Sequence, residues 1–160
     1  MCETVKINRL NPKNTHLIVD WCKDKGEDFL RQWAGNGYSY PLTEKQITDR
    51  LSEGAEIFEA HLNDIMIGTI EIINRDELEH TALIGRFVLD QNITQRGLGT
   101  QMLMVFLQYC REMLDISEVA LYVFDFNTAA RKCYQKCGFM EEGCEERPNG
   151  WKAIRMKKVL

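Results

Sequence analysis

Residues 95–100 read Gln95-Arg96-Gly97-Leu98-Gly99-Thr100, a glycine-containing stretch that lies between a predicted strand and a predicted helix. The strand is expected at about Thr81 to Leu89. The helix is expected at Leu98 to Leu114, because its apolar residues recur at helical spacing. Amides at the start of a helix and the positive end of its dipole favour phosphate oxygens, and glycine lets a large anion approach the backbone. The stretch therefore predicts an anion site, with an ordinary glycine-rich turn as the alternative.

The chain upstream of this stretch predicts helices followed by strands. A capping box at Thr43 to Gln46 marks the start of one helix, after two shorter helical stripes. Strands are expected at Ile57 to Leu62 and at Ile65 to Ile73, on either side of a tight turn at Asn63-Asp64.

The chain downstream predicts a further strand, helix and strand. Alternating apolar residues from Val119 predict the strand, and Asn127 caps a predicted helix that runs through Lys136. Gly138 is expected to end that helix in a left-handed conformation, and a final strand is expected at about Lys152 to Leu160. The order of elements indicates an α+β or mixed α/β fold around one sheet.

The composition is typical of a single soluble domain spanning residues 1–160. Hydrophobic residues make up 44% of the chain and charged residues 28%. The most apolar stretch, Ile65 to Ile73, is too short to span a membrane, and Glu3 interrupts any export signal, so we expect a cytoplasmic protein with no membrane partner. The net charge of −4 argues against a nucleic-acid partner and mildly favours a cationic one.

The cysteines predict neither a disulfide scaffold nor a metal site. The chain has six cysteines in 160 residues. Cys133 and Cys137 lie on successive helical turns without a neighbouring histidine that would complete a set of ligands. We expect reduced thiols and no bound metal.

The second half of the chain resembles the GNAT family of N-acetyltransferases. That family's acyl-CoA loop has the form Gln/Arg-x-x-Gly-x-Gly/Ala, and the matching frame here is Thr94-Gln95-Arg96-Gly97-Leu98-Gly99. Further on, the family has a strand, an asparagine, and a helix with a tyrosine just before a Gly-Phe pair, which resemble Asn127, Tyr134 and Gly138-Phe139. Thr94 departs from the pattern, and Gln95 or Arg96 is the substitute for its phosphate contact. The resemblance implies a mixed, mostly antiparallel sheet flanked by helices.

The resemblance also implies a role for each matched residue toward acetyl-CoA, with no metal. Tyr134 is expected to be the general acid that protonates the departing thiolate, with a buried packing tyrosine as the alternative. The Leu89 amide is expected to donate to the thioester oxygen. Asn127 is expected to bind pantetheine, to cap its helix, or both. The full set of expected cofactor contacts is Phe87, Val88, Leu89, Thr94, Gln95, Arg96, Gly97, Leu98, Gly99, Thr100, Asn127 and Arg131.

No carboxylate occurs on the predicted strand where many family members carry their general base. Glu71 on the preceding strand is the remaining candidate, because burial of a carboxylate brings its pKa toward the working range. A solvent-facing Glu71 is the alternative, and His80 at a strand end is a weaker candidate. Arg86 is expected either to bind an acceptor carboxylate or to pair with Glu71.

The resulting hypothesis is an acetyl-CoA-dependent N-acetyltransferase that moves an acetyl group to a primary amine by direct attack. The acceptor is expected to be a small amine or a protein N-terminus, bound near aromatic residues such as Trp33, Tyr38 and Tyr40. A homodimer is an open alternative to a monomer. The rival hypothesis is a binding module that keeps the acyl-CoA groove as a sensor or docking surface without turnover.

Overall fold

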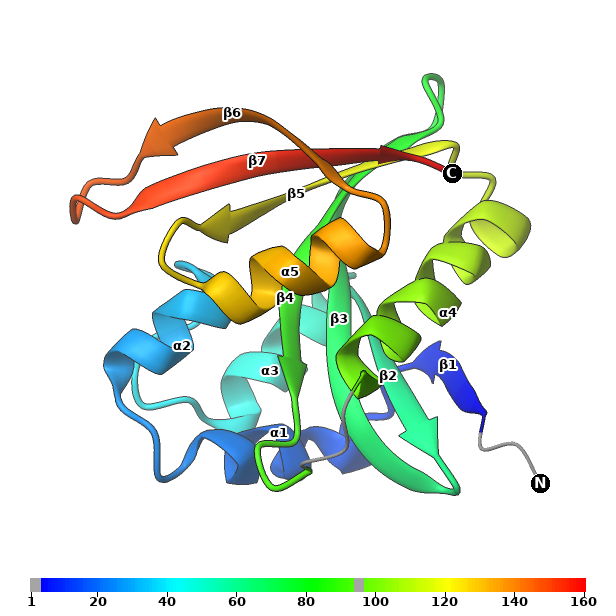
Figure 1. The fold of residues 1–160 in the computed structure, drawn as a ribbon. Coiled ribbons are helices and arrows are strands. Elements are labelled where there is room, and N and C mark those ends of the chain that lie inside the picture. Colours follow the sequence, from blue (N-terminus) through cyan, green and yellow to red (C-terminus); the bar gives the residue numbers. More distant parts are fainter. Residues whose placement is uncertain (1–3, 94–96) are drawn as a thin grey trace. The chain divides into compact units, whose positions relative to one another are not determined.

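A computed structural model describes residues 4–93 and 97–160 of the chain, and their path is drawn in Figure 1. In chain order, the elements of these residues are β1 (Val5–Arg9), η1 (Pro12–Asn14, a 3-10 helix), α1 (Thr15–Cys22), α2 (Glu27–Ala34), α3 (Glu44–Ser52), β2 (Glu56–Leu62), β3 (Ile65–Asp76), β4 (Thr81–Leu89), α4 (Leu98–Leu114), β5 (Glu118–Phe124), α5 (Thr128–Lys136), β6 (Met140–Glu146) and β7 (Lys152–Val159).

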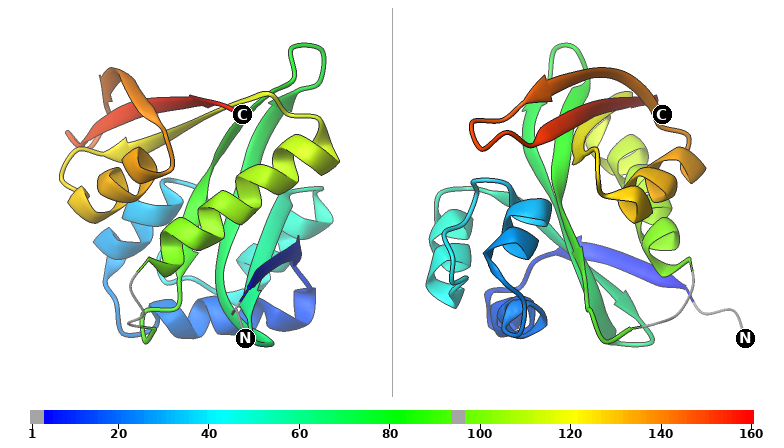
Figure 2. Two further views of the ribbon diagram at one scale, coloured as in Figure 1. Left: turned by 45° about the vertical axis from the view of Figure 1, so that its right-hand side comes forward. Right: turned by 60° about the vertical axis from the view of Figure 1, so that its left-hand side comes forward.

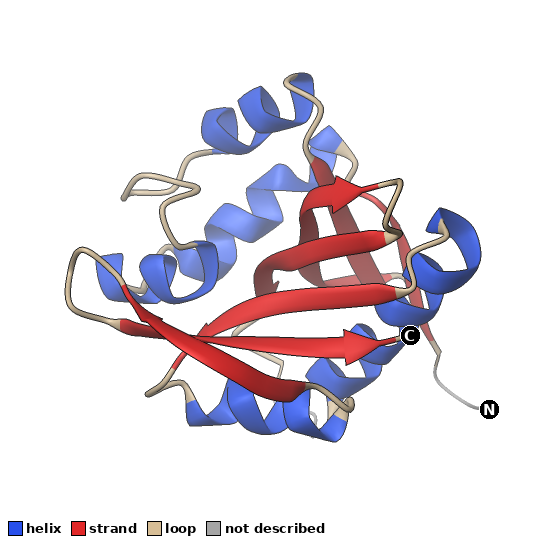
Figure 3. Cartoon of the chain, turned by 90° about the horizontal axis from the view of Figure 1, so that it is seen from above, coloured by secondary structure: helices blue, strands red, loops and turns tan. Residues whose placement is uncertain are grey.

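The strands of the described residues form one sheet in the order β1-β2-β3-β4-β5-β7-β6. β4 and β5 pair in parallel, whereas β1 with β2, β2 with β3, and β7 with both β5 and β6 pair antiparallel. Figure 3 shows β7 running between β5 and β6 toward the C-terminus. This mixed, mostly antiparallel sheet flanked by helices confirms the predicted fold class.

The chain divides into two compact units. The N-terminal unit is Met1–Ile73 with Gly85–Arg96, and the C-terminal unit is Asn74–Ile84 with Gly97–Leu160. The prediction of a single domain stays a prediction. Across the described residues, no helix is both long and apolar enough to cross a membrane.

The core of the N-terminal unit packs the first three helices against strands β2 and β3. The right-hand view of Figure 2 shows these helices on the same side of the two strands. The buried residues of this core include Ile18, Trp21, Leu30, Ala34, Ile47, Ile57, Met66 and Val88. Local signals place the elements as predicted: the Thr43 hydroxyl accepts from the Gln46 amide at 3.3 Å, and Asn63 and Asp64 both have the positive φ that a tight hairpin turn requires.

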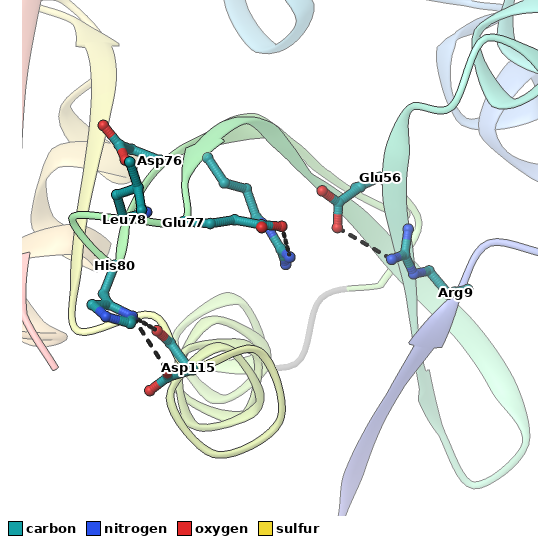
Figure 4. A network of polar contacts seen from close by, with 8 residues as sticks. Arg9, Glu56, Asp76, Glu77, Leu78, His80 and Asp115 are labelled. Carbon is teal, nitrogen blue, oxygen red and sulfur yellow. Dashed lines mark hydrogen bonds and ion pairs between the residues drawn. The ribbon is translucent and has the colours of Figure 1, made fainter.

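Helix α4 supplies much of the core of the C-terminal unit. Its buried side includes Leu103, Phe106, Leu107 and Cys110, as its helical spacing predicts. Asp115 ends the helix in the left-handed conformation, and its carboxylate lies 3.2 Å from the ring of His80, as Figure 4 shows. His80 therefore ties the turn between β3 and β4 to the end of α4.

Glu59 is a buried carboxylate on β2 that anchors the N-terminal loop. Glu59 is only 1% exposed to solvent. One oxygen accepts from the backbone amide of Asn11 at 2.6 Å, and the other accepts from the side-chain amide of Asn14 at 2.8 Å and contacts the His61 ring. A buried carboxylate with this many partners fixes the loop, because each partner would be left unsatisfied without it.

We expect Glu59→Ala to lower the free energy of unfolding by about 3 kcal/mol, because it leaves buried polar groups without their acceptor. Urea denaturation followed by circular dichroism measures this change. Glu145→Ala is the control, since Glu145 is exposed and pairs with Arg147 at the surface, and its effect should stay within about 0.5 kcal/mol. Equal effects of the two substitutions would contradict the anchoring role of Glu59.

Candidate active site

The predicted phosphate loop starts helix α4 in the C-terminal unit. Gly97 has φ +75° and precedes the first helical residue, Leu98. A side chain added at Gly97 would meet no atom within 4 Å, so the left-handed backbone, and not lack of space, is what favours glycine there. The backbone amides of a first helical turn have no partner within their own helix, so those of Leu98, Gly99 and Thr100 are suited to an anion. Thr94, Gln95 and Arg96 lie outside the described residues.

Helix α5 carries the other predicted contacts of this unit. The Asn127 side chain accepts from the Ala130 amide at 3.3 Å, which confirms its role as a helix cap. Arg131 donates to the Asp125 carbonyl at 3.0 Å and to the Glu141 carboxylate at 2.7 Å. These two bonds use two of the five N–H donors of the guanidinium group, and the predicted phosphate contact of Arg131 stays a prediction.

Tyr134 lies about two turns after Asn127 on the same helix and is buried at 8% exposure. Its ring meets the ring of Phe139 edge-on, with centroids 5.9 Å apart. Burial raises the pKa of the Tyr134 phenol, and the neighbouring thiols of Cys133 and Cys137 raise it further. A tyrosine phenol is protonated at neutral pH even at its ordinary pKa, so Tyr134 has a proton to give, and the raised pKa makes that proton harder to lose.

Thr100 joins the start of α4 to α5 through two thiols. Its hydroxyl lies 3.5 Å from the Cys133 sulfur, and its carbonyl lies 3.8 Å from the Cys137 sulfur. These contacts bring the predicted phosphate loop and the helix of Tyr134 together within the unit. Hydrogen bonds from Cys137 and Thr100 and the charge of Lys136 lower the pKa of the Cys133 thiol to about 6, although burial opposes the shift.

The end of β4 carries the predicted pantetheine contacts of the N-terminal unit. Val88 is buried, and the Leu89 carbonyl accepts from the Gln91 side chain at 2.8 Å. Directly before Phe87, Arg86 has φ +48°, a left-handed conformation that is uncommon for a side chain of this size. The strand therefore bends just before the backbone groups that the family resemblance assigns to the thioester.

Glu71 on β3 is 2% exposed and is held by two arginines. Arg50 donates to both carboxylate oxygens, at 2.7 Å for Oε2, and Arg86 also donates to Oε2. The predicted pairing of Arg86 with Glu71 is thus confirmed. The pKa of the Arg50 guanidinium is raised, chiefly by its hydrogen bond to Glu71. The general-base role of Glu71 stays a prediction, and it would require an amine to displace a guanidinium group.

Comparison with known proteins identifies the family of the chain. A family model described as the acetyltransferase (GNAT) family matches residues 17–139. The chain belongs to this family. Among the described residues of this GNAT chain, no group of three or more histidine, cysteine or acidic side chains is arranged to hold a metal ion.

Solved structures share the fold of this GNAT chain at low sequence identity. A spermidine N-acetyltransferase from Vibrio cholerae, in complex with CoA and spermine, has a TM-score of 0.81 and 15% identity, covering 98% of this chain and 95% of that one. An acetyltransferase from Salmonella typhimurium that modifies the N-terminal serine of ribosomal protein L7/L12 has a TM-score of 0.79 and 17% identity, with the same coverage.

A curated relative matches part of the GNAT chain by sequence. The spermine/spermidine N(1)-acetyltransferase of Bacillus subtilis strain 168 is 28% identical over 78 residues. The match covers 49% of this chain and 51% of the relative, so it spans about half of each protein.

We expect Cys133 to react with iodoacetamide faster than an ordinary thiol at pH 7, because its thiolate form predominates above a pKa of about 6. Protonation should slow the reaction as the pH falls through about 6. Mass spectrometry of modified peptides measures the rate at each position, and the exposed Cys144 is the control. A Cys133 rate that rises only above pH 8 would contradict the lowered pKa.

Proposed function

We propose that this GNAT chain transfers the acetyl group of acetyl-CoA to a primary amine by direct attack. The observation that carries the proposal is the contact of helices α4 and α5 through Thr100, Cys133 and Cys137. It places a helix start suited to pyrophosphate next to the helix that presents a buried, protonated Tyr134. Membership of the acetyltransferase family supports the same conclusion.

Each unit contributes its own part of the chemistry. In the C-terminal unit, the first-turn amides of α4 hold the pyrophosphate, and Tyr134 gives its proton to the thiolate as the tetrahedral intermediate collapses. In the N-terminal unit, the backbone at Phe87 to Leu89 receives the pantetheine arm, and the Leu89 amide stabilises charge that develops on the thioester oxygen.

The acceptor that we propose is a small cationic alkyl amine of the polyamine type. The net charge of −4 favours a cation, and the curated relative is named for spermine and spermidine. A protein N-terminus is the second candidate, because the fold is shared with an enzyme that modifies an N-terminal serine. The two acceptors differ chemically, because an alkyl ammonium has a pKa of about 10.4 and an α-ammonium a pKa of about 8. A polyamine therefore depends more on a general base to remove its proton before it attacks.

Replacement of Tyr134 by phenylalanine tests the general acid. We expect Tyr134→Phe to lower kcat by about 10²-fold or more, because it removes the proton donor, while the affinity for acetyl-CoA changes little. Thiol release measured with Ellman's reagent gives kcat, and calorimetry gives the affinity. Tyr122→Phe is the matched control, since the Tyr122 hydroxyl accepts a hydrogen bond from Arg155 on β7 at 3.3 Å and has no assigned role toward either substrate. An unchanged rate for Tyr134→Phe would remove this residue from the acid role.

An amine screen tests the proposed activity itself. Spermine, spermidine and short peptides with free N-termini are incubated with the protein and acetyl-CoA, and thiol release is recorded. Release with the polyamines supports the proposal, and release with peptides alone moves the acceptor to protein N-termini. Binding of acetyl-CoA without release for any amine would favour the sensor hypothesis.

A further inference from the structure

Arg86 has an unusual backbone conformation within the N-terminal unit. It lies inside strand β4 with φ +48°, where a residue with a β-carbon meets steric strain. Strain of this kind persists only where surrounding contacts hold the residue in place. The contacts of Arg86 therefore indicate what holds the bend before Phe87.

The Arg86 side chain contacts two elements other than its own strand. Its Nη1 atom donates to the Glu71 carboxylate on β3. Its Nε atom donates at 3.3 Å to the carbonyl of Ala34, the last residue of helix α2, which also accepts from the Gly37 amide at 2.9 Å. A β-carbon at Gly37 would lie 2.3 Å from that Nε atom, so glycine at this position leaves room for the guanidinium group.

Arg50 on α3 completes the group from the other side. It donates to Glu71 Oε2 at 2.7 Å, and its guanidinium carbon lies 5.4 Å from the centre of the Tyr38 ring. Glu71 is thereby fixed by two arginines, and Arg86 is fixed by Glu71 and Ala34. Arg86 is thus held directly by strand β3 and by the end of α2, and helix α3 acts on it only through Glu71.

We propose that Arg86 is a positioning residue for acetyl transfer. Its side chain holds the left-handed bend, and the bend sets the direction of the backbone amides of Phe87, Val88 and Leu89. These amides are the groups that the proposed function assigns to the pantetheine arm and the thioester, so this inference rests on that function. Arg86 acts through the backbone, and Glu71 orients Arg86.

Two substitutions at position 86 separate the bend from the side chain. Glycine adopts positive φ without a steric penalty, whereas alanine does not, and both lack the guanidinium group. We expect Arg86→Ala to lower kcat at least tenfold at a temperature where it is fully folded, and to weaken the binding of acetyl-CoA, because the same amides hold the pantetheine arm. Arg86→Gly should recover several-fold of that loss. If the Arg86–Glu71 ion pair had only a structural role, Arg86→Ala and Arg86→Gly would have the same kcat per folded molecule.

The inference is overturned if folded Arg86→Ala keeps the wild-type kcat, or if Arg86→Gly is no faster than Arg86→Ala. Arg9→Ala is the matched control, because Arg9 also pairs with a glutamate of the same unit, Glu56, at 3.1 Å, as Figure 4 shows. That control should leave kcat unchanged.

A third variant keeps the inference testable if Arg86→Ala fails to fold. Glu71→Gln retains the shape of the partner and removes its charge, so we expect a moderate drop in kcat with the pH profile unchanged in form. Loss of the acidic limb of that profile would instead identify Glu71 as the base and overturn its role in orienting Arg86.

Backbone NMR separates this inference from the proposed function. The amide signals of residues 87–89 should stay near their wild-type positions in Arg86→Gly and move in Arg86→Ala. Movement in neither variant overturns the inference. A wild-type protein that transfers acetyl to no amine would overturn the proposed function, while the NMR comparison would still decide whether Arg86 holds the bend.

Discussion

The N-terminal unit depends on one buried negative charge, the carboxylate of Glu71. Removing a carboxylate from water costs several kcal/mol unless hydrogen bonds and opposite charge offset it. Here Arg50 and Arg86 supply both, and they come from a helix and a strand that are distant from Glu71 in the sequence. Loss of either arginine leaves the charge undercompensated, at a cost of about 3–5 kcal/mol. The end of α2, helix α3 and strands β3 and β4 are therefore held together by electrostatics as well as by apolar packing.

Local signals in the sequence were sufficient to predict the elements that have them. The capping box at Thr43, the turn at Asn63-Asp64 and the asparagine cap of α5 each depend on contacts between neighbouring residues, and the structure confirms all three. Strand β6 was not predicted, because every one of its residues is exposed and it has no alternation of burial. Strand β6 is defined by its pairing with β7, and the sequence of residues 140–146 alone does not indicate this pairing.

The candidate site shows the same division between local and long-range information. The glycine loop and Tyr134 were recognised because their motif is contiguous or regularly spaced. Arg50 was missed as a partner of Glu71, since 21 residues separate them and an arginine on a helix is usually solvated. The backbone conformation of Arg86 was also beyond prediction, because only tertiary contacts make a left-handed arginine stable within a strand.

Strand β6 has a consequence for how the protein behaves in concentrated solution. It is the last strand in the sheet order of the described residues, so one of its sides carries backbone groups that a foreign strand could pair with. Four of its seven residues are glutamates, and all seven are exposed. Three of these glutamates pair with arginines, Glu141 with Arg131, Glu142 with Arg155 and Glu145 with Arg147, so the strand carries charged groups of both signs. Pairing with a foreign strand would strip water from these charged side chains, so they disfavour self-association of this open edge into extended β-structure.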